Sequence, residues 1–77
     1  MAQFLAGKTI IKILCVNFGF HIVHQKGSHI KLQKKIIDRT ITTIVPNHTE
    51  VAIGTLYGIL KLAEVDKKEF FVYSQNK

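Results

Sequence analysis

The sequence predicts an α+β fold in which a three-stranded antiparallel sheet carries helices on one face. Three observations predict this fold. Apolar residues recur with helical spacing over residues 8–18 and again from Val51 or Ile53 to Ala63. Between these two segments lie three short runs of alternating or β-branched residues, which is the pattern of strands. The expected order is α-β-β-β-α with a short extra helix at the C-terminus, and the other face of the sheet is free.

The chain of 77 residues is expected to form one domain over residues 1–77. A domain of this size buries only roughly 62% of the surface that its unfolded chain exposes. One thin core is therefore the limit, which excludes multidomain enzymes and folds that enclose a large cofactor. The apolar fraction of 47% and the charged fraction of 21% are typical of a globular chain and too apolar for a disordered one.

The first helix is predicted over residues 8–18, with Lys8 and Lys12 on its solvent side. Its core side carries Ile10, Ile11, Leu14, Cys15 and Phe18. Gly19 can adopt the left-handed conformation that ends a helix. Ile13 and Val16 lie off the core side, so each is a candidate either for a partner surface or for an isolated exposed aliphatic side chain.

Residues 20–26 and 28–34 are predicted to form a hairpin around Gly27. In the second run, strand alternation places Ser28, Ile30 and Leu32 on the buried face. His29, Lys31 and Gln33 therefore face solvent. The same alternation, applied to the first run, places His21 and His24 on opposite faces of the sheet.

A third strand is predicted over residues 40–45 and ends at Pro46. The second helix ends near Ala63 and takes Thr49 or Thr55 as its N-terminal cap. Asp66 lies three residues before Glu69, which is the spacing of a capping box. A short terminal helix that packs back on the core is therefore expected.

The chain has 11 Lys and Arg residues against 5 Asp and Glu residues, for a net charge of +6. A basic balance of this kind favours nucleic acid or another acidic partner. The single cysteine, Cys15, excludes an intrachain disulfide and fits a reducing compartment. Because the chain shows neither a signal-peptide pattern nor an apolar run near ~18 residues, we expect a cytoplasmic protein that does not bind a membrane.

The four histidines show no spacing that is typical of metal ligands, and the carboxylates show no paired spacing. No metal site and no cofactor are therefore predicted. His29 stands out because it is expected on the free sheet face beside Lys31, directly after Gly27 and Ser28. The alternative is an ordinary surface histidine. His48 lies in the loop after the third strand, where a capping role is equally compatible with the pattern.

Short motifs along the chain carry a resemblance to a known family. They are Gly19-Phe20, Gln25-Lys26-Gly27-Ser28-His29, Val45-Pro46-Asn47-His48, Gly54-Thr55-Leu56 with Ile59-Leu60, and Glu69-Phe70. In this order and spacing, from about Gly7 to Phe71, the chain resembles the HicA family of toxin ribonucleases. The segment 34–39 departs from the family pattern, because Ile36 and Ile37 stand where family members usually carry polar turn residues.

The resemblance implies a fold like that of a double-stranded-RNA-binding domain, an mRNA-cleaving activity without metal, and a HicB antitoxin as partner. It also implies that His29 is the catalytic residue, with Gly27 and Ser28 as its neighbours. We expect substrate contacts from Lys26, Gly27, Ser28, Lys31, Lys34, Lys35, Arg39 and His48. A non-catalytic RNA-binding module and a domain that docks an acidic protein are the alternatives, and nothing in the sequence indicates a homo-oligomer.

Overall fold

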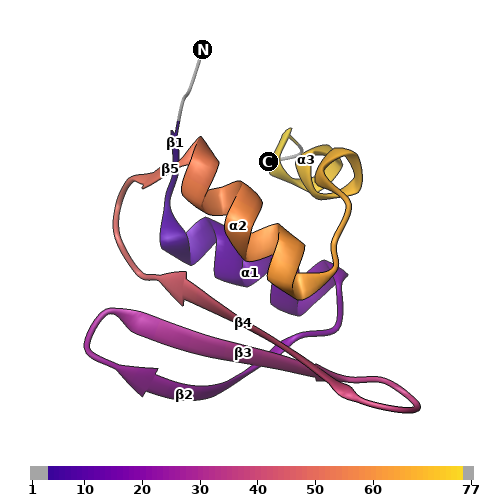
Figure 1. Ribbon diagram of the computed structural model, residues 1–77. Helices are drawn as coiled ribbons and strands as arrows, with labels where there is room; N and C mark the ends of the chain where they lie inside the picture. Colours follow the sequence, from indigo (N-terminus) through magenta and orange to yellow (C-terminus); the bar gives the residue numbers. More distant parts are fainter. Residues whose placement is uncertain (1–3, 76–77) are drawn as a thin grey trace.

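The computed structural model describes residues 4–75 and has the predicted α+β architecture (Figure 1). Its helices are α1 (Gly7–Asn17), α2 (Ile53–Ala63) and α3 (Lys67–Gln75). Its main sheet contains β2 (His21–Lys26), β3 (His29–Lys35) and β4 (Thr40–Pro46). Two further strands, β1 (Phe4–Leu5) and β5 (Val51–Ala52), form a separate antiparallel pair. Within residues 4–75 no helix has the length and apolar character needed to cross a membrane.

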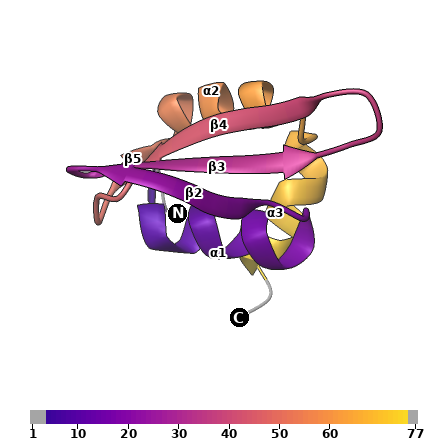
Figure 2. The ribbon, with the colours of Figure 1, turned by 90° about the horizontal axis from the view of Figure 1, so that it is seen from below.

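The main sheet is antiparallel throughout, with β3 between β2 and β4. Helices α1 and α2 lie above it in Figure 1, and no described element covers its lower face, which we call the open face. Seen from below, α2 follows β4 and α1 lies toward β2 (Figure 2). The arrangement confirms the predicted sheet with helices on one face.

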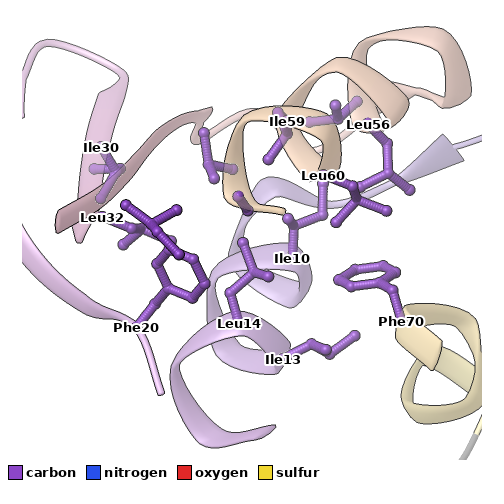
Figure 3. Close-up of a cluster of buried hydrophobic side chains, with 14 residues drawn as sticks. Ile10, Ile13, Leu14, Phe20, Ile30, Leu32, Leu56, Ile59, Leu60 and Phe70 are labelled. Carbon is purple, nitrogen blue, oxygen red and sulfur yellow. The ribbon is translucent and has the colours of Figure 1, made fainter. Parts of the chain in front are cut away.

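The core lies between the sheet and the helices, and α3 closes it on the side away from the sheet (Figure 3). Phe70 of α3 is fully buried and lies next to Ile13 of α1. Ile13 is only 6% exposed, so its predicted position outside the core is wrong. The predicted core side of α1 is the side that packs against the sheet. Helix α3 covers a second side of α1, and Ile13 lies on that side. Val16 remains 72% exposed.

The helix caps are only partly as predicted. Neither Thr49 nor Thr55 caps α2, because the chain enters that helix directly from β5 and Ala52 occupies the N-cap position. Pairing with β1 holds this entry extended. The start of α3 is as expected, since the Glu69 amide donates a hydrogen bond to Asp66 Oδ2 at 3.2 Å.

Candidate active site

A β-bulge in β2 decides which side chains reach the open face. His21 pairs with Gln33 of β3, but His24 pairs with Lys31, so β2 contains one more residue than β3 over this stretch. Residues that pair directly across two strands share a face of the sheet. His21 and His24 therefore both lie on the open face with Lys31. The prediction that they lie on opposite faces is wrong, because it assumed uninterrupted alternation along β2.

The open face is hollowed where the β2–β3 turn meets β4. The hollow has a volume of about 550 Å³ and is lined by His24, Lys26, Gly27, Ser28, His29, Lys31 and Ile44. Every titratable side chain in this lining is basic, and no carboxylate belongs to it. A hollow with this lining attracts an anion such as a phosphate group.

Hydrogen bonds from β2 and from the loop after β4 fix the turn that precedes His29. Gly27 has a φ of +58°, as the first central residue of a tight type II′ hairpin turn requires. The Gln25 side-chain amide donates to the Gly27 carbonyl oxygen at 3.1 Å, and the Asn47 amide donates to the Ser28 carbonyl oxygen at 2.6 Å. Because these hydrogen bonds fix the turn, the backbone that carries the exposed imidazole of His29 has a defined position.

His48 lies at the edge of the hollow, where its Nε2 is 3.2 Å from the Ser28 hydroxyl oxygen. The start of α1 holds the His48 backbone, because the Gly7 amide donates to the His48 carbonyl oxygen at 2.7 Å. A Cβ atom at Gly7 would collide with the Pro46 carbonyl oxygen and the backbone of Asn47. Gly7 is therefore a supporting residue that the sequence analysis missed, since no local pattern marks a contact across about forty residues.

The remaining predicted contacts do not join this hollow. Lys34 lies on the face of β3 that the helices cover, opposite the open face. Its Nζ lies 5.8 Å from the ring centroid of Phe20. Lys35 shares the open face with His29 but pairs with Thr40 at the opposite end of β3. Arg39 lies in the loop beyond that end and forms ion pairs with two carboxylates, those of Asp38 and Glu64.

The sequence offers two other features that can carry chemistry, the single cysteine and the histidines and carboxylates that could bind a metal. Cys15 is half-buried on α1 and packs against the core, and this burial raises the pKa of its thiol. A raised pKa favours the neutral thiol over the nucleophilic thiolate. Among residues 4–75 no three or more His, Cys, Asp or Glu side chains come together as a group able to hold a metal ion.

Comparison with known families identifies the part of the chain that carries this site. A family model described as the HicA toxin of bacterial toxin-antitoxin matches residues 7–65. The matched segment runs from the start of α1 to just beyond α2, and it contains the whole lining of the hollow together with His48. Helix α3 lies outside it. Comparisons with curated proteins and with solved structures gave no match.

Proposed function

The chain belongs to the HicA toxin family of bacterial toxin–antitoxin systems, and from this premise we propose that it is an endoribonuclease that cleaves mRNA on the open face. The observation that carries the proposal is the position of His29 in the hollow, between Lys26 and Lys31 and with no carboxylate in the lining. This arrangement combines a group that can transfer a proton with cations that can hold a phosphate.

RNA supplies its own nucleophile, the 2′-hydroxyl group. Its oxygen attacks the adjacent phosphorus, the bond from phosphorus to the 5′-oxygen breaks, and the products are a 2′,3′-cyclic phosphate and a free 5′-hydroxyl. The protein has to hold the reacting atoms in line, move a proton and stabilise the charge on the phosphate oxygens. His29 transfers a proton to or from one of the two oxygens, which is typically worth roughly 10²- to 10⁴-fold in rate. Lys26 and Lys31 stabilise the phosphate.

The other residues of the hollow act on the RNA backbone. At Gly27 nothing lies within 4 Å of the position that a Cβ would occupy, so the turn leaves open space for a close approach of the ribose-phosphate chain. The Ser28 hydroxyl contacts RNA and is oriented by His48. Lys34, Lys35 and Arg39 lie away from the cleaved bond and attract RNA over a longer range.

Family membership implies a toxin–antitoxin pair. We propose a HicB-like protein as the antitoxin and the open face around His29 as the surface that it covers, because covering this face blocks the RNA site directly. The proposed place of action is the cytoplasm, where mRNA is translated.

The decisive experiment incubates the purified protein with RNA in excess EDTA. We expect cleavage, with 2′,3′-cyclic phosphate and 5′-hydroxyl ends on the products. A 2′-deoxy substitution in the nucleotide 5′ to the cut should abolish it, because the nucleophile is then missing. A 5′-phosphate product, or cleavage of DNA, would indicate an activated water and contradict the scheme. Tight RNA binding without any cleavage would favour the alternative, a non-catalytic RNA-binding module.

A further inference from the structure

The open face carries a second row of side chains next to the row that contains His29. In this second row, His24 of β2 pairs with Lys31 of β3, and Lys31 pairs with Ile44 of β4. All three residues line the hollow. The two rows are two residues apart along β3, or roughly 6.6 Å at the rise of a strand. This spacing is comparable to the separation of successive phosphates in an extended RNA strand.

The chemistry of this second row differs from that of a simple cationic patch. Ile44 is 44% exposed, and it contributes the one large apolar side chain among the residues that line the hollow. His24 contributes a planar ring on the other side of Lys31, and it is there only because of the bulge in β2. The aliphatic side chain and the flat ring can both contact the apolar face of a nucleobase. The cation between them can contact the phosphate of the same nucleotide.

We propose that His24 and Ile44 bind the base of the nucleotide next to the cleaved bond, in a single-stranded stretch of RNA. This inference rests on the proposed function, since His29 marks the position of that bond. Lys31, which lies between His24 and Ile44, holds the cleaved phosphate, and this phosphate joins that nucleotide to the next one. In a duplex the faces of a base are covered by its neighbours in the stack, so a paired strand cannot supply this contact. Because every base has a flat face, the site discriminates little between bases.

The test measures binding in a His29→Ala background, so that the RNA stays intact. The probes are a short single-stranded RNA, the same sequence as a duplex, and single-stranded copies with one abasic nucleotide at each position in turn. The variants are His24→Ala and Ile44→Thr, the second of which keeps a β-branched side chain in the strand. His21→Ala is the matched control, because His21 lies on the same face in the next row and outside the lining of the hollow.

His24→Ala and Ile44→Thr are each expected to weaken binding of the single strand by roughly five- to thirty-fold. In the His29→Ala protein, an abasic nucleotide at one position should weaken binding by a similar factor. In the protein that also carries Ile44→Thr, the same abasic nucleotide should weaken binding little further. His21→Ala should change affinity by less than about two-fold, and the duplex should bind more weakly than the single strand.

Equal losses for His21→Ala and His24→Ala would overturn the proposal, and so would duplex binding as tight as that of the single strand or the absence of any sensitive abasic position. Cleavage by the protein with His29 intact is measured separately. One outcome is that this protein does not cut RNA although His24→Ala, Ile44→Thr and the abasic nucleotide still weaken binding as expected. In that case the nuclease function fails and the base contacts of His24 and Ile44 are supported.

Discussion

The two ends of the sheet differ in what their basic residues can do. At the β2–β3 end, Lys26, His29 and Lys31 converge on one hollow that has no carboxylate in its lining. At the β3–β4 end, roughly 20 Å away along β3, Arg39 is ion-paired with Asp38 and Glu64, and Lys34 lies beside Phe20. Similar positive charge in the sequence is thus gathered around one hollow at the first end, whereas at the other end Arg39 and Lys34 contact other side chains of the protein.

The difference arises from strand alternation, pairing and the neighbours that tertiary folding supplies. Alternate residues of β3 face opposite sides of the sheet, so Lys34 cannot share a surface with Lys31 or Lys35. The loop that carries Arg39 reaches the left-handed C-cap of α2, where Glu64 has a φ of +58°. A cation that already has a carboxylate partner contributes less to the binding of RNA phosphates.

The largest effect is expected for His29→Ala, which should lower the rate of RNA cleavage by roughly 10²- to 10⁴-fold through the loss of proton transfer. Because His29 is exposed, its removal creates no cavity, and the thermal unfolding curve should be unchanged. His21→Ala, on the same face but outside the lining of the hollow, is the control and should retain a nearly full rate. A His29→Ala protein that cuts at the parent rate would rule out the assigned role.

Gly7→Ala should destabilise the protein by about 2 to 4 kcal/mol, because the added Cβ displaces the Pro46 carbonyl and weakens the hydrogen bond from Gly7 to His48. Urea unfolding measures this loss. Gly58→Ala is the matched control, since nothing lies within 4 Å of its added Cβ in the middle of α2. That variant should gain about 0.5 to 1 kcal/mol. If both variants lose stability equally, the clash at Gly7 is not the cause.

The salt dependence of RNA binding should separate the two ends directly. With roughly 3 to 5 phosphates neutralised, the slope of log affinity against log salt concentration should be about −2 to −3.5. Lys26→Ala and Lys31→Ala should each reduce the magnitude of the slope by about 0.7. Arg39→Ala should reduce it by less than half of that amount, because its carboxylate partners already offset its charge. If Arg39→Ala reduced the slope as much as Lys26→Ala or Lys31→Ala, the basic residues at the two ends of the sheet would contribute equally to RNA binding.

His48→Ala should reduce the cleavage rate by only about 2- to 12-fold, which corresponds to the loss of one hydrogen bond to the Ser28 hydroxyl. Single-turnover cleavage measures the change, and Ser28→Ala should show a comparable loss. The double variant should lose little more than either single one, since both changes remove the same contact. A loss as large as that of His29→Ala would mean that the two histidines share the proton transfers.

The smallest effect is expected for the ion pair at the far end. Arg39→Ala should lower the free energy of unfolding by about 0.2 to 1 kcal/mol, because both partners in the pair with Glu64 are about half exposed and solvent screens their attraction. Urea unfolding at low and high salt checks this value, and the difference from the parent should shrink as salt rises. A loss above about 2 kcal/mol, unchanged by salt, would show that Arg39 contributes through packing.

The three helices, the three-stranded sheet and the position of His29 on its free face followed from the sequence alone, but the short pair of strands β1 and β5 did not. Helical spacing identified α1 and α2, and the alternation around Leu32 placed His29 and Lys31 on the open face. These features are local, because each depends on residues that are neighbours along one element. A resemblance in short ordered motifs identified the family in the same way, and the match over residues 7–65 confirms it.

Only the tertiary structure decided how the site is assembled. The bulge that brings His24 to the face of Lys31 depends on the pairing of β2 with β3, and its extra residue leaves no mark on the apolar pattern. The burial of Ile13 depends on Phe70, and the position of His48 depends on Gly7 at the start of α1. Each of these contacts joins segments that are far apart along the chain or in separate elements. Periodicity describes one element at a time, so it carries no information about which element will lie against another.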